Sequence, residues 1–72
     1  MTYADTISRD TAEFAPRIER DFKTGDITFR WNRDVHPETL NEYLGLEDMV
    51  GRDRSGYPSL EVPKEIAEQV IA

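Results

Sequence analysis

The sequence predicts a small α+β domain in which one or two short strands pack against two to three short helices. Three observations support this fold class. The segment Ile27–Asn32 alternates apolar and polar residues, as a half-buried strand does. Pro37 and Pro63 each precede a run with helical periodicity. The length of 72 residues leaves too little apolar surface for a second core, so we treat residues 1–72 as a single domain.

The first third of the chain has a helical pattern in two parts. Its large apolar residues lie close to a spacing of three, four and seven and would share one stripe of a helix: Tyr3, Ile7, Phe14, Ile18 and Phe22. Pro16 interrupts the stripe, and we predict that it opens a second helix over Arg17–Lys23. Residues 1–10 are expected to be poorly ordered unless a partner docks on them, because terminal segments have few contacts of their own.

The clearest strand is Ile27–Asn32, which follows a turn at Thr24–Asp26. Its apolar members are β-branched or aromatic and would all face one way, and Trp31 is among them, which favours burial of that side chain. A strand cannot stand alone, because its backbone N–H and C=O groups need partners. We therefore expect it to pair with Leu60–Val62, with a second copy of itself, or with another protein.

The second half of the chain contains two helices that open with proline. The first runs Pro37–Leu44 and ends at Gly45, a residue suited to the left-handed position after a helix. Leu46–Val50 is expected to add a further helical turn. A charged, exposed loop over Arg52–Pro58 then leads through the short strand to a last helix. That helix should cover Lys64–Ala72 and bury its apolar residues, Ile66, Val70 and Ile71.

Composition limits the chemistry that the chain can perform. There is no cysteine, which excludes disulfides and thiolate metal sites, and only one histidine, His36. His36 immediately precedes a helix that opens with proline, so we interpret it as an N-cap or surface residue and not as a base or a metal ligand. The sequence has neither a glycine-rich phosphate loop nor a nucleophile elbow. We therefore predict no enzyme activity, no cofactor and no metal.

The charge balance is acidic, with fifteen Asp and Glu against nine Lys and Arg and a formal net charge of −6. This charge disfavours non-specific binding to nucleic acid or to an anionic membrane, because phosphate groups would be repelled. No segment approaches the roughly 20 apolar residues of a membrane span. The first ten residues have neither the basic region nor the apolar run of a signal peptide, so we expect a cytoplasmic protein.

Two segments mix aromatic with basic residues, which are the ingredients of a surface that stacks single-stranded nucleic acid. They are Phe29–Arg33 and Arg52–Tyr57. Aspartates in or beside both segments reduce their positive charge, and no predicted helix carries a basic stripe. The sequence therefore favours a different kind of partner.

A related alternative uses the acidic residues themselves. A small acidic protein can imitate the phosphates of DNA, as phage-type inhibitors of nucleic-acid enzymes and anti-defence proteins do. Basic residues are interleaved with the acids along most of this chain, which is typical of a solvated mixed-charge surface. A local acidic face remains open as an alternative around Glu38, Glu42, Glu47 and Asp48.

The segment Ser59–Val70 resembles the strand-to-helix step of ribbon-helix-helix and AbrB-type antitoxins. Those families dimerise through a strand and bind DNA. The resemblance implies a DNA-binding transcriptional regulator or antitoxin that uses the C-terminal strand and helix. It covers only a common strand–Pro–helix design with proline at the first helical position, so we do not assign the family.

The leading hypothesis is a small, acidic, non-enzymatic module that binds a protein partner, as an adaptor or inhibitor, alone or as a homodimer. It rests on the marginal core, the strand that lacks an assured neighbour, and the missing catalytic motifs. Trp, Tyr and Arg contribute most of the binding energy at protein interfaces. The candidate partner-binding residues are therefore Trp31, Tyr43, Arg54 and Tyr57.

Overall fold

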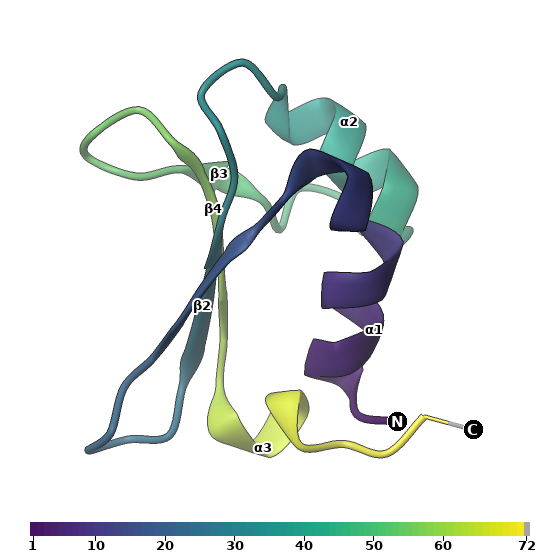
Figure 1. Cartoon of the computed structure of the whole chain (residues 1–72), viewed down its shortest axis with the longest axis vertical. Helices are drawn as coiled ribbons and strands as arrows, with labels where there is room; N and C mark the ends of the chain where they lie inside the picture. Colours follow the sequence, from purple (N-terminus) through teal and green to yellow (C-terminus); the bar gives the residue numbers. More distant parts are fainter. Residues whose placement is uncertain (72) are drawn as a thin grey trace.

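The computed structural model describes residues 1–71. It consists of a four-stranded antiparallel sheet that is covered on one face by helices (Figure 1). The strand order is β1-β2-β4-β3. The α+β class is confirmed, but the prediction of one or two strands is wrong. The elements in chain order are α1 (Tyr3–Asp10), the 3-10 turn η1 (Ala12–Phe14), β1 (Arg17–Arg20), β2 (Ile27–Arg30), α2 (Pro37–Leu44), β3 (Gly51–Arg52), β4 (Pro58–Val62) and α3 (Lys64–Ala67).

Strand β1 forms where the sequence predicted a helix over Arg17–Lys23. It pairs antiparallel with β2, from Arg17 opposite Arg30 to Arg20 opposite Ile27. Arginine and glutamate are good helix formers, so local propensity alone favours the helix. The strand forms because β2 offers a row of backbone partners, a non-local contact that overrides local preference. All four residues of β1 are exposed, as suits the edge of a sheet.

Strand β2 has a neighbour along both edges. Beside β1 on one edge, it pairs with β4 on the other, from Ile27 opposite Val62 to Arg30 opposite Ser59. The predicted pairing with Leu60–Val62 is confirmed. The strand therefore requires neither a second copy nor another protein to satisfy its backbone, and this reason for expecting a partner no longer applies.

The hydrophobic core lies between the sheet and the helices. Trp31 is 1% exposed and stacks on Phe29, with ring centroids 6.0 Å apart. Its predicted burial is confirmed, so it offers no exposed anchor to a partner. The buried hydrophobic residues come from every layer: Ile7, Ile27, Phe29, Trp31, Leu40, Val50, Leu60, Val62 and Ala67.

Helix α2 begins and ends as predicted, with Pro37 in its first turn and Gly45 in the left-handed conformation after it. The further helical turn predicted over Leu46–Val50 is absent from the described chain. The reason is the buried Asn41 side chain, whose Oδ1 accepts the backbone N–H of Val50 at 3.0 Å, while its Nδ2 donates to the Val50 carbonyl at 3.4 Å. Because these bonds occupy both backbone groups of Val50, this residue does not take part in a helical turn.

Helix α3 is a single turn, and the prediction that it would continue and bury three apolar residues is wrong. The exposed fractions are 43% for Ile66, 80% for Val70 and 38% for Ile71. Instead of continuing the helix, Val70 forms a β-bridge with Thr2. The predicted helix also included residue 72, which lies outside the described residues.

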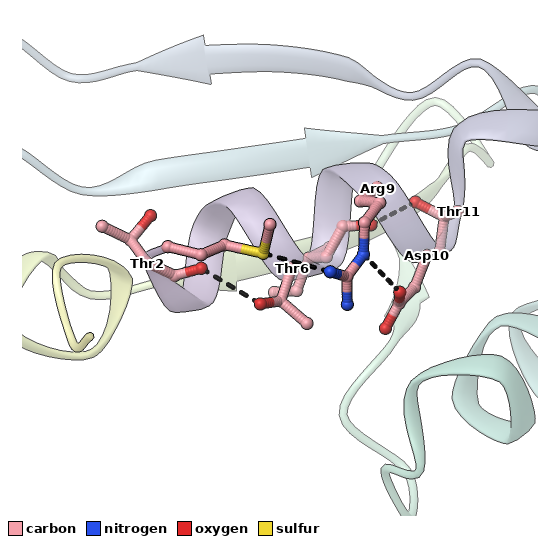
Figure 2. A network of polar contacts seen from close by, with 7 residues as sticks. Thr2, Thr6, Arg9, Asp10 and Thr11 are labelled. Atoms are coloured by element: carbon pink, nitrogen blue, oxygen red, sulfur yellow. Dashed lines mark hydrogen bonds and ion pairs between the residues drawn. The ribbon is translucent and has the colours of Figure 1, made fainter. Parts of the chain in front are cut away.

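Helix α1 contacts the rest of the chain through its backbone and its apolar face, and the expectation that residues 1–10 are poorly ordered without a docked partner stays a prediction. The N–H of Tyr3 donates to the carbonyl of Gln69 at 2.8 Å, and Ile7 is buried in the core. Thr2 and Asp5 cap the helix reciprocally. Figure 2 shows further local contacts along this helix, including the hydroxyl of Thr11 donating to the carbonyl of Ile7 at 2.7 Å.

A substitution pair tests the central place of β2. Phe29→Ala should remove about 3–5 kcal/mol of stability, the usual cost of truncating a buried phenylalanine. A core of this size supplies about the same amount, so we expect the variant to be largely unfolded by circular dichroism. Ile18→Ala, opposite Phe29 on the exposed edge strand, should cost about 1 kcal/mol or less in urea unfolding. Equal losses in the two variants would contradict this account of the core.

Candidate functional site

The four predicted partner-binding residues do not form one surface. Trp31 is buried, and Tyr43 is half exposed on α2, where its ring meets the ring of Phe14 edge to face at 5.1 Å. Arg54 lies exposed at the tip of the turn between β3 and β4. Tyr57 is partly buried at the end of the same turn. Of the four, only Trp31 and Tyr57 line the same hollow.

That hollow, which we call the arginine hollow, has a volume of about 300 Å³. It lies where the chain enters β1 and leaves β2. Its lining is mostly polar and consists of Ala15, Arg17, Arg30, Trp31, Asn32 and Tyr57. Ala15 adopts a left-handed conformation, with φ of 49°, as the chain turns from η1 toward β1. This conformation is costly for a residue with a Cβ atom and is maintained only by its surroundings.

Two arginines lie against the ring of Tyr57. The guanidinium carbon of Arg30 is 5.3 Å from the ring centroid and that of Arg33 is 4.7 Å from it. Both distances are within the range of cation–π attraction. The fold thus joins the two segments that mix aromatic and basic residues, Phe29–Arg33 and Arg52–Tyr57, which are separate in the sequence.

Asp53 fixes this arrangement, although the sequence analysis did not single it out. Its Oδ1 accepts the backbone N–H groups of Ser55 at 2.9 Å and Tyr57 at 3.0 Å. Its Oδ2 lies 3.0 Å from Nη2 of Arg30. The hydrogen bond from the Tyr57 N–H is the largest of the effects that lower the pKa of Asp53 below its usual value. An Asp followed two residues later by Ser-Gly is a turn signal, and the sequence did contain it.

The indole N–H of Trp31 is a buried donor without a hydrogen-bond acceptor in the described chain. A buried donor left unsatisfied costs about 1–3 kcal/mol. The backbone N–H of Trp31, by contrast, donates to the carbonyl of Pro58 at 3.0 Å. Trp31 lines the arginine hollow, but its indole N–H is buried in the core and is not open to the hollow.

A second feature lies at the tip of the β1–β2 hairpin, which projects away from α1 and α2 (Figure 1). Phe22 is 100% exposed there. The backbone around it is nevertheless fixed by Asp21, whose Oδ1 accepts the N–H of Lys23 at 2.8 Å and that of Thr24 at 3.3 Å. The hairpin closes through the N–H of Asp21, which donates to the carbonyl of Asp26 at 2.9 Å.

The tip is also attached to the body of the domain. Oδ1 of Asp26 accepts the N–H of Lys64 in the first turn of α3 at 3.0 Å. Gly25 has φ of 80°, and a Cβ atom there would lie 2.8 Å from Cδ of Lys64, so glycine suits both the turn and the close approach of α3. The hairpin tip is therefore a fixed platform for an exposed phenylalanine.

Phe22 lies on a helical stripe in the sequence, and for this reason its exposed position at the hairpin tip was not predicted. The available signal was the turn at Thr24–Asp26. If Arg17–Arg20 is paired with β2 across that turn, Phe22 falls in the connecting loop, where no core residue is near it.

The structure also bears on the alternatives. Strand β4 leads into α3 as predicted, but Pro63 is the N-cap residue and not the first helical residue. Within the sheet, β4 pairs with β2 over residues 59–62 and with β3 at Pro58 and Ser59. The antitoxin resemblance implies strand pairing between two chains. Because β2 occupies one edge of β4, only the other edge of residues 60–62, which β3 does not reach, is left for such pairing. The four residues of the acidic face are all exposed, and none forms an ion pair with another described residue: Glu38, Glu42, Glu47 and Asp48. His36 is the N-cap residue of α2, as predicted, without a side-chain capping bond.

Within residues 1–71, no group of three or more acidic or histidine side chains is placed to hold a metal ion. None of the described helices has the length and apolar character needed to cross a membrane. Comparisons of the chain with protein-family models, with curated proteins and with solved structures find no match. The arginine hollow and the hairpin tip are therefore the two candidate functional surfaces of the described chain.

The lowered pKa of Asp53 predicts a pH-dependent contribution to stability. The carboxylate stabilises the fold at pH values above the usual pKa of 3.8, and this contribution is lost as the pH falls through the lower pKa of the folded state. We expect Asp53→Asn to unfold at lower urea concentration than wild type near neutral pH, and the two to converge as the solution is acidified below 3.8.

The matched control is Asp48→Asn, because the carboxylate of Asp48 is exposed and has no hydrogen bond or ion pair with another described residue. It should change the urea midpoint little at any pH. A deficit in Asp53→Asn that stays constant across the pH series would show that the carboxylate charge is not what holds the turn.

Proposed function

We propose that the protein is a non-enzymatic module that binds a protein partner through the tip of its β1–β2 hairpin. The exposed side chain of Phe22 is the observation that supports this proposal most directly. It makes no contribution to the core, yet phenylalanine is among the residues most often found buried. Transfer of such a side chain into an apolar pocket releases about 1.5–3 kcal/mol. A partner with that pocket would gain this energy from a single residue.

The fixed backbone of the tip supports the same proposal. A flexible loop loses conformational entropy when it binds, and a loop that already has its bound shape loses less. Here Asp21 holds the backbone within the tip, and Asp26 attaches the tip to α3. These bonds present Phe22 in one place. The hairpin is therefore better suited to docking than an exposed phenylalanine on a disordered segment would be.

The surroundings of Phe22 indicate the chemistry of the partner surface. Arg20, Asp21 and Lys23 are exposed beside it and carry both signs of charge. An apolar anchor with a polar, charged rim is the usual organisation of a protein interface. The partner should offer an apolar pocket with a polar margin, and the module would act as an adaptor or inhibitor by occupying it. The net charge of −6 favours a protein over a nucleic acid in this role.

The test compares three purified, tagged proteins in affinity capture from a native lysate: wild type, Phe22→Ala and Met49→Ala. Met49 is also a large exposed apolar residue, 63% exposed, but it lies in the loop before β3. Proteins retained by wild type and Met49→Ala should be lost with Phe22→Ala. For a purified partner, we expect an affinity at least about tenfold lower, or about 1.4 kcal/mol.

Stability measurements keep this result interpretable. Because Phe22 is fully exposed, Phe22→Ala should unfold within about 0.5 kcal/mol of wild type. The proposal would be contradicted if wild type, Phe22→Ala and Met49→Ala captured identical sets of proteins. Light scattering separates a partner of a different kind from a second copy of this chain, since a homodimer joined by the tips would become monomeric in Phe22→Ala.

A further inference from the structure

We propose that the arginine hollow binds a small oxyanion, namely the carboxylate or phosphate group of a small molecule. This inference goes beyond the proposed docking function, because it concerns other residues and another class of ligand. Phe22 follows the Arg20 end of β1, whereas the hollow is at the Arg17 end. The observations that support it are a pair of opposed cations, a set of hydrogen-bond donors, and the size of the hollow.

The opposed cations are Arg17 and Arg30, which are directly paired across β1 and β2. Both line the hollow. Like charges directly opposite each other destabilise a pair of strands. Arg30 is neutralised by Asp53 at 3.0 Å and approaches Glu19 at 3.9 Å, but Arg17 forms no ion pair with any described residue. An oxyanion bound in the hollow would give Arg17 the counter-charge that Arg30 already has, and guanidinium is well matched to carboxylate and phosphate.

Two further lining residues, Asn32 and Tyr57, carry side-chain donors. Asn32 uses its Oδ1 to accept the N–H of Asp34 at 3.4 Å, which leaves its NH₂ group as a donor. Tyr57 contributes a hydroxyl group, which can donate as well. A lining with guanidinium, amide and hydroxyl donors is complementary to an acceptor-only ligand with negative charge.

The size of the hollow indicates what carries the oxyanion. A volume of about 300 Å³ is at the lower end of the range for small-molecule pockets and about ten times the volume of one water molecule. The hollow therefore has room for an organic group beside the oxyanion. A long polyanion such as nucleic acid would be repelled by the net charge of −6, whereas a ligand with one or two charges would experience mainly the local arginines.

The single tryptophan lines the hollow and provides a local readout, because its indole N–H gives one resonance in a ¹H–¹⁵N spectrum of the purified protein. The probes are inorganic phosphate, phenyl phosphate, acetate and benzoate, each titrated at constant ionic strength against chloride. We expect the indole resonance to shift saturably with at least one probe and not with chloride. The two phosphate probes and the two carboxylate probes distinguish the sources of the oxyanion.

The variants are Arg17→Gln and Arg20→Gln. Each removes one positive charge from β1, but only Arg17 lines the hollow. Arg17→Gln should weaken the binding of the active probe at least tenfold while unfolding at about the same urea concentration as wild type, because Arg17 is exposed and forms no ion pair with another described residue. Arg20→Gln should bind as wild type does. The proposal is overturned if none of the four probes shifts the indole resonance saturably, or if both variants weaken binding equally.

Discussion

Strand β2 is paired along both edges, and its covered face contributes Ile27 and Phe29 to the core, with Trp31 directly after it. A chain of 72 residues without cysteine has no disulfide to restrict its unfolded state, so its stability depends on this burial. The other elements depend on β2 in turn. Strand β1 forms because β2 offers it backbone partners, and both the hairpin tip and the arginine hollow are built where β1 and β2 meet.

The acidic composition has a structural side that the net charge conceals. Asp21 and Asp53 accept backbone N–H groups within their own turns, and Asp26 accepts the N–H of Lys64 and so attaches the hairpin tip to α3. Their carboxylates shape the two surfaces on which our proposals rest. Aspartate is favoured in turns because its short side chain reaches nearby backbone donors. Part of the negative charge therefore belongs to carboxylates that hold loops in shape, and these carboxylates do not form an anionic binding face.

The elements with local signals could be predicted from the sequence, and those with distant causes could not. β2 was predicted from its alternation, and α2 from Pro37 and Gly45. β1 was not, because nothing within Arg17–Arg20 indicates that a strand ten residues later will pair with it. α3 was predicted too long because its end is set by the bridge between Val70 and Thr2, at opposite ends of the described chain.

The candidate surfaces show the same division. Tyr57 and the basic residues around Trp31 were recognised as two separate segments, but the contact of Arg30 and Arg33 with the Tyr57 ring is a product of the fold.

The β-bridge at Thr2 and the bond from the N–H of Ile71 to the carbonyl of Met1 place both ends of the described chain side by side (Figure 1). A domain with adjacent ends can be inserted into an exposed loop of a carrier protein, or its order along the chain can be permuted, without separating its layers.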